Sequence, residues 1–289
     1  MLARTSLIPT DYDSYNTSYE YLAHADALLG PDQSPDLANY VRCTSGAFHN
    51  IAGALYQDGK YAGAVRFLKK GCTVGQAALR MRAKQSGEAK DADAEAAWRL
   101  LREGLFRRYE LLGICHSKMG DRRPAYDAFV ESVQTFPFQD STSILLFDDS
   151  TATKQLGTII DRLTYIGACE LLLPPVEVSL RAPLFSHSSS IVGAVLERQV
   201  ESLETSLWKE GVGAVVLGLL QDLMGVYLAH EMPMRRARVL LRQLEVSYKA
   251  GLDGHRHADD IGDEVMELLG RDVRFLACSF PIHIREIDC

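Results

Sequence analysis

Residues 45–72, SGAFHNIAGALYQDGKYAGAVRFLKKGC, contain two helical patterns separated by a turn. In the first pattern, apolar or small side chains recur at offsets of 0, 3, 4 and 7, which places them on one face of an α-helix: Phe48, Ile51, Ala52 and Leu55. The second pattern repeats this spacing at Tyr61, Ala64, Val65, Leu68 and Cys72. Between them lies Gly59, which can adopt the left-handed conformation that ends a helix and reverses the chain. The stretch therefore predicts an antiparallel helical hairpin.

This spacing is typical of tetratricopeptide repeats, in which W-x2-L-G-x2-Y is followed by A-x3-F and a later Pro. The first copy reads Phe48-x2-Ile51-Ala52-x2-Leu55 and Ala64-x3-Leu68. A second copy reads Tyr109-x2-Leu112-Gly113-x2-His116, Ala125-x3-Phe129 and Pro137. A third, degraded copy reads Met224-Gly225-x2-Leu228 and Ala237-x3-Leu241, with Pro233 in the turn. The copies predict an all-α fold, an irregular tetratricopeptide-like α-solenoid of antiparallel helical hairpins.

The predicted array is irregular, because 61 residues separate Phe48 from Tyr109, whereas regular repeats recur at about 34 residues. We expect N-terminal repeats over residues 1–137, with a polar insertion near residues 84–95, and a connection at residues 138–150. Further hairpins follow over residues 151–289, with an irregular loop at residues 174–190 and an extended C-terminal tail. Apolar periodicity places helices at residues 12–29, 98–115, 152–172, 191–208, 212–229, 234–250 and 261–269.

Composition and charge restrict the class of protein. A net charge of −7 and a pI near 5.6 argue against a general nucleic-acid binder. The six cysteines form no C-x-x-C pair, which favours a reducing, intracellular compartment. The N-terminus lacks the apolar core of a signal peptide. The longest apolar run, residues 212–220, is nine residues long, short of the ~20 needed to cross a bilayer, so no membrane association is expected.

No motif in the chain predicts catalysis, a cofactor or a metal. The patterns G-x-S-x-G, G-x-x-x-x-G-K and H-E-x-x-H do not occur. His255 and His257 lie beside two aspartates, but without a third cluster at ligand spacing they are typical of a solvated turn. His187 lies among serines, which resembles a hydrolase site only in composition. His116 occupies a large-residue position of the second copy, which indicates a structural role.

Basic side chains on helix faces are the polar feature that predicts binding. Two stripes follow helical spacing, one at Arg66, Lys69 and Lys70 and one at Arg235, Arg238 and Arg242. In an acidic chain such stripes can receive an acidic or phosphorylated partner segment. The alternative is that they form the solvated side of amphipathic helices.

Residues 40–72 also resemble the helical-repeat region of fungal separases. The run YVRCTSGAFHNIAGALY (residues 40–56), followed by Gly59-Lys60-Tyr61, Ala64 to Leu68 and Gly71-Cys72, carries the resemblance. Separases are large cysteine proteases that cleave the cohesin kleisin at anaphase. Their catalytic His and Cys lie in another domain whose H-G-x-G-like and G-C-S-S-G-like sequences do not occur here, so no catalytic residue is implied.

The resemblance implies that the chain is a segment of a larger protein in the cytoplasm and nucleus. Its solenoid would bind the inhibitory chaperone securin and help to position the kleisin. Two alternatives remain open: a stand-alone tetratricopeptide adaptor unrelated to proteolysis, and a helical enzyme that uses His187, His255 or His257.

Overall fold

A computed structural model of the chain shows an all-α protein. It describes residues 12–29, 37–84, 92–136, 151–178, 189–205, 211–229, 233–251, 263 and 265. The main helices are α1 (Tyr12–Leu29), α2 (Leu37–Gln57), α3 (Tyr61–Lys84), α4 (Ala92–Met119), α5 (Arg122–Thr135), α6 (Thr151–Tyr165), α8 (Ser189–Thr205), α9 (Val212–Ala229) and α10 (Pro233–Lys249). No strand occurs in these segments, which confirms the predicted fold class.

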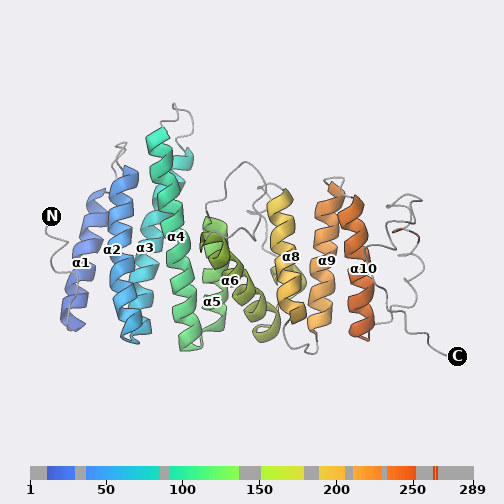
Figure 1. Ribbon diagram of the computed structural model, residues 1–289. Helices are drawn as coiled ribbons and strands as arrows, with labels where there is room; N and C mark the ends of the chain where they lie inside the picture. The colour runs from blue at the N-terminus through green and yellow to red at the C-terminus, as the bar shows by residue number, and fades with distance from the viewer. Residues whose placement is uncertain are drawn as a thin grey trace.

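The helices stand side by side in one row that runs from α1 at the N-terminal end to α10 (Figure 1). Helices adjacent in sequence pack on each other, as α2 does on α3, α4 on α5, and α9 on α8 and α10. Contacts of α4 with α2, and of α8 with α6, join one hairpin to the next. This arrangement is the predicted α-solenoid of helical hairpins.

The first hairpin, α2 and α3, forms as the sequence predicts. Gly59 has φ of +72° and ends α2, and the amide of Lys60 donates to the carbonyl of Leu55 at 2.8 Å. Ala52 and Ala64 are fully buried, so the two helices approach closely where their side chains are smallest.

The second hairpin, α4 and α5, repeats the same turn. Gly120 has φ of +82°, and the amide of Asp121 donates to the carbonyl of His116 at 3.0 Å. A Cβ built on Gly113 would lie 2.6 Å from Cε1 of Phe129, so no larger residue fits at this crossing. The small and large positions of the second repeat pattern therefore pack against each other.

The third hairpin, α9 and α10, exists, but Gly225 of the third repeat copy does not lie where two helices cross. Gly225 is exposed, and a Cβ built on it would meet nothing within 4 Å. Leu228 is 58% exposed, whereas Leu223 and Tyr227 are buried. The third repeat copy thus matches residues on the solvent-exposed face of α9, because the pattern fits small residues whether they face solvent or a neighbouring helix.

Helix α6 ends differently from the prediction for residues 152–172. Its last turns form a π-helical segment, η2 (Ile166–Glu170), in which Gly167 packs on the ring of Tyr126 of α5. A Cβ at Gly167 would lie 2.8 Å from that ring, and the wider π turn accompanies this close approach. The predicted irregular loop at residues 174–190 is also partly wrong, because Pro175–Val178 forms a short helix, α7, and α8 begins at Ser189.

Several predicted connections extend beyond the described residues. In the predicted polar insertion, α3 extends through Lys84 and α4 begins at Ala92. Residues 138–150 and the C-terminal tail lie outside the described part of the chain, and of the helix predicted at residues 261–269 only Asp263 and Val265 are described, both as helical.

Helix α9 is the most apolar of the described helices and packs one side into the core. It is 18 residues long with a mean hydropathy of 1.8, so by length and composition alone it could cross a membrane. The nine-residue run counted from the sequence therefore underestimates its apolar length. Eight of its residues are buried in the array, among them Val216, Leu219 and Tyr227, as is typical of a core helix. The absence of a membrane partner stays a prediction.

Candidate partner-binding surfaces

Arg66, the first residue of the predicted α3 stripe, binds α1. Its Nη1 donates to Oδ1 of Asn16 at 2.7 Å, and its Nη2 lies 3.7 Å from Oε1 of Glu20. The guanidinium carbon is 4.0 Å from the centroid of the Tyr19 ring, a cation–π distance. Arg66 therefore joins α1 to the first hairpin and already has partners within the chain.

The α2–α3 hairpin, Arg66 included, is strongly basic although the chain as a whole is acidic. Residues 37–84 contain eight Lys or Arg and one acidic residue, Asp58, which gives this segment a net charge of +7. Helix α3 alone contains six of these basic residues and no acidic one. Lys69 and Arg80 are exposed, whereas Lys70 is partly buried. The hairpin thus presents a concentration of positive charge that counting over the whole chain conceals.

Arg242, in the second predicted stripe, pairs with a carboxylate. Its Nε donates to Oε1 of Glu204 on α8 at 2.9 Å, and its Nη2 donates to Oε2 of the same residue. These hydrogen bonds raise the pKa of Arg242 above its ordinary value. The pair links α8 to α10.

The other two residues of this stripe differ from each other. The guanidinium of Arg235 lies 5.5 Å from the ring centroid of Tyr227, whose hydroxyl also hydrogen-bonds to Glu197. Arg238 is exposed. The predicted α10 stripe therefore includes one arginine paired with a carboxylate, one over an aromatic ring and one facing solvent.

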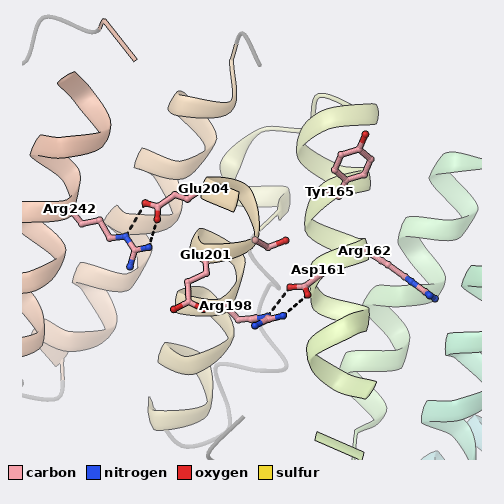
Figure 2. A pocket seen from close by; sticks show the side chains of 8 residues that line it. Asp161, Arg162, Tyr165, Arg198, Glu201, Glu204 and Arg242 are labelled. Carbon is pink, nitrogen blue, oxygen red and sulfur yellow. Dashed lines mark hydrogen bonds and ion pairs between the residues drawn. The ribbon is translucent and has the colours of Figure 1, made fainter. Parts of the chain in front are cut away.

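A groove of about 630 Å³ lies between α6, α8 and α10. Arg198 of α8 donates from Nε and Nη2 to the two carboxylate oxygens of Asp161 on α6, at 2.8 and 2.6 Å. Figure 2 shows this pair and the Glu204–Arg242 pair on either side of α8. The groove is lined by Asp161, Arg162, Tyr165, Arg198, Glu201, Ser202, Glu204 and Arg242.

The charges of this groove largely cancel. Two arginines are engaged by carboxylates in bidentate pairs, and the third, Arg162, points away from both pairs (Figure 2). Such a lining favours a segment that offers both donors and acceptors over a simple anion. Arg242 is the only predicted binding residue among those that line this groove.

Cys72, Cys115 and His116 are buried within the repeat helices. Burial raises the pKa of the Cys72 thiol to about 12 and that of Cys115 to about 11, so both are protonated at neutral pH and are poor nucleophiles. His116 is 5% exposed, and its Nδ1 lies 3.1 Å from Oδ2 of Asp121 at the α4–α5 turn, which agrees with a structural role.

No possible metal site occurs among the described residues, where no three His, Cys, Asp or Glu side chains lie together. His187, His255 and His257 lie outside the described residues. The hypothesis of a helical enzyme that uses these histidines therefore receives no structural test.

Sequence reasoning missed the carboxylates that engage the arginines. Asp161 lies 37 positions from Arg198, and Glu204 lies 38 positions from Arg242. Each pair joins different hairpins, so no local spacing predicts it. The charge imbalance of residues 37–84 is visible in the sequence. It is the signal that could have identified the first hairpin as a candidate binding surface.

Comparison with known proteins assigns no family, because no protein-family model matches the chain and no curated protein matches it. What the chain binds is therefore inferred from the surfaces described above.

Proposed function

We propose that the chain is a helical-repeat scaffold that binds an acidic segment of a partner protein through the α2–α3 hairpin. The observation that carries this proposal is the net charge of +7 on residues 37–84 of a chain whose overall charge is −7. Lys69 and Arg80 are exposed on α3 and can contact acidic side chains. Segregated charge of this kind attracts an oppositely charged partner and orients its approach.

The architecture suits an extended partner. Stacked hairpins present their helices as one long surface, along which a segment without its own fold can make many weak contacts. Contacts to exposed Lys and Arg contribute mainly to the association rate and to salt dependence. The binding should therefore weaken as ionic strength rises.

The α10 stripe, which consists of Arg235, Arg238 and Arg242, has a smaller role in this proposal. Arg242 would have to leave Glu204 before it could bind a partner, and that exchange has a desolvation cost. Arg235 and Arg238 are both exposed, but Arg235 lies over the ring of Tyr227. Replacing Arg238 alone with Glu tests this surface without breaking the Arg242–Glu204 pair.

The resemblance of residues 40–72 to fungal separases supports a more specific proposal, that the chain is a scaffold segment of a separase. Under this proposal the partner is securin, the cohesin kleisin is positioned along the same array, and the protein works in the cytoplasm and nucleus. The alternative is an adaptor with the same fold and an unrelated acidic partner.

Calorimetry with securin and kleisin fragments distinguishes the two proposals. Under the separase proposal we expect securin to bind with a dissociation constant in the micromolar range or tighter. The double variant Lys69→Glu/Arg80→Glu should weaken binding by about tenfold or more, whereas Lys118→Glu, an exposed lysine on α4, should not. Binding of other acidic segments but not of securin would favour the adaptor, and equal affinity of both variants would refute the proposed surface.

A further inference from the structure

The junction of α2, α3 and α4 contains a buried guanidinium without an anionic partner. Arg108 of α4 is 3% exposed, and its Nε donates to the carbonyl of Ser45 on α2 at 2.9 Å. Its Nη1 is buried and has no hydrogen-bond partner. Burial lowers the pKa of Arg108 to about 10, so the group is charged at neutral pH, and no carboxylate is among the groups that affect it. A buried charge in this state is costly unless an anion joins it.

Two glycines make room for this side chain. The guanidinium turns back over Gly104, where an added Cβ would lie 3.1 Å from Nη2 and 3.3 Å from Nη1 of Arg108. An added Cβ at Gly71 of α3 would lie 3.5 Å from Cδ of Arg108. Residues from three helices thus enclose the guanidinium and hold it in a defined position.

His49 adds a second unpaired group to the same junction. It follows Ser45 by one turn, so both residues lie on one face of α2, and the charge of Arg108 acts on its ring. The Nδ1 of His49 is buried without a partner, although the residue as a whole is partly exposed. Burial, followed by the charges of Arg108 and Arg107, lowers the pKa of His49 to about 4. The ring is therefore neutral at pH 7, and in the Nδ1–H tautomer it can donate a hydrogen bond.

The outer edge of the junction is also basic. Arg42 precedes His49 by seven residues, which places both on one face of α2, and Arg42 is exposed. An acidic segment that lies along this face would meet Arg42 and then the partly exposed edge of His49. His49 and Gly104, which both lie beside the guanidinium, are partly exposed, so the junction reaches the surface at these two residues.

We propose that Arg108 and His49 form a receiving site for one carboxylate of the partner's acidic segment. The site rests on the proposed function and deepens it. Exposed Lys69 and Arg80 attract the acidic segment, whereas Arg108 and His49 bind one specific carboxylate group of that segment. The carboxylate accepts hydrogen bonds from Nη1 of Arg108 and from His49, and it supplies the missing counter-charge. The arginine is already desolvated in the free chain, so its share of the desolvation cost does not recur on binding.

A stability measurement separates a binding role of Arg108 from a structural one. In Arg108→Met the Ser45 carbonyl keeps its acceptor role in the α2 helix, so no backbone group is left unpaired. If Arg108 serves to bind a carboxylate and does not stabilise the free chain, the melting temperature of this variant equals or exceeds that of the wild type. The substitution then removes an uncompensated buried charge. A clear decrease in melting temperature would overturn the proposal, because it would show that the free chain already depends on Arg108.

Acetate serves as the probe for the carboxylate. Sodium acetate should raise the melting temperature of the wild type above that in sodium chloride at equal ionic strength, and should have no such effect on Arg108→Met. An equal melting temperature of the wild type in the two salts would overturn the proposal. It would show that acetate does not bind beside Arg108, and a buried water would then be the partner of its Nη1.

Two peptides distinguish the source of the carboxylate. One is acetylated and amidated with an internal Glu, and the other has a free C-terminal carboxylate and no acidic side chain. We expect whichever peptide binds the wild type to lose at least about tenfold in affinity with Arg108→Met and a smaller factor with His49→Gln, which keeps a polar side chain. Undiminished affinity with both variants would overturn the site, yet would leave the scaffold proposal intact. An acetate effect without any binding of acidic peptides would refute the scaffold proposal and retain the site.

Discussion

Gly113 of α4 and Phe129 of α5 are in direct contact where the two helices cross. The nearest ring atom, Cε1, would lie only 2.6 Å from a Cβ placed on Gly113, and two further ring atoms would lie at 2.7 and 2.9 Å. Phe129 is fully buried, so its ring has little space into which it could move. This contact sets the separation of α4 and α5 and makes the second hairpin depend on the absence of a side chain.

We therefore expect Gly113→Ala to destabilise the chain. Alanine gains up to about 1 kcal/mol of helix propensity, but overpacking a rigid core costs about 1–3 kcal/mol or more at so short a distance. The expected net loss is about 2 kcal/mol in the free energy of unfolding, measured by urea denaturation. The matched control is Gly157→Ala in α6, where an added Cβ meets nothing within 4 Å and a gain of about 0.5–1 kcal/mol is expected. Equal effects of the two substitutions would contradict the packing described for α4 and α5.

The Arg242–Glu204 pair should contribute measurable coupling between α8 and α10. Its geometry is bidentate and both side chains are partly buried, at 36% and 25% exposure. A double-mutant cycle with alanine should give a coupling energy of about 1 kcal/mol or more. The comparison is the Lys249–Glu245 pair on α10, whose side chains are 58% and 61% exposed and for which at most about 0.5 kcal/mol is expected. A coupling energy for Arg242–Glu204 no larger than that of the exposed pair would show that it does not link the helices.

The cysteines should differ in reactivity. Cys43 is exposed, whereas burial raises the pKa of Cys72 to about 12 and that of Cys115 to about 11. Iodoacetamide at pH 8 should alkylate Cys43 in the native chain and leave Cys72 and Cys115 unmodified until denaturant is added. Mass spectrometry of tryptic peptides gives the extent at each site. Alkylation of Cys72 at the rate of Cys43 would contradict the closed packing of the first hairpin.

His49 should make the stability of the chain depend on pH. Its pKa is lowered in the folded chain to about 4 from 6.5, so between these values the unfolded chain binds more protons. Its contribution to stability is thus fully present above about pH 6.5 and is lost as pH falls toward 4. His49→Gln should reduce the decrease in melting temperature over this range, and Arg108→Met should also reduce it, because the charge of Arg108 contributes to the shift. An unchanged pH profile in both variants would contradict the buried, neutral state of His49.

The fold was predictable from the sequence where side-chain size and turn chemistry act locally. Gly59 and Gly120 both end a helix with positive φ, as the sequence pattern at Gly59 predicts, and Ala52 and Gly113 lie at helix crossings. The same reasoning fails at Gly225, which matches the pattern but faces solvent. A single match cannot tell which side of a helix meets its neighbour, since this depends on the hairpin that precedes it.

The binding surfaces were less predictable than the fold. Spacing along one helix correctly placed Arg66, Lys69 and Lys70 on α3, but it could not reveal that Arg66 binds Asn16, fifty positions away on α1. Arg108 gave no signal at all, because its burial results from the packing of three helices. Long-range contacts of this kind decide which cations remain available for a partner, and local periodicity does not encode them.

The affinity of the chain for an acidic peptide, measured by fluorescence anisotropy at low and at physiological salt, tests the central claim most directly. For an amidated peptide rich in Asp and Glu, we predict binding that weakens as salt increases and that falls by about tenfold in Lys69→Glu/Arg80→Glu. A basic peptide of equal length should not bind. Equal affinity of the wild type and the charge-reversed variant at both salt concentrations would contradict the assignment of the α2–α3 hairpin as the partner-binding surface.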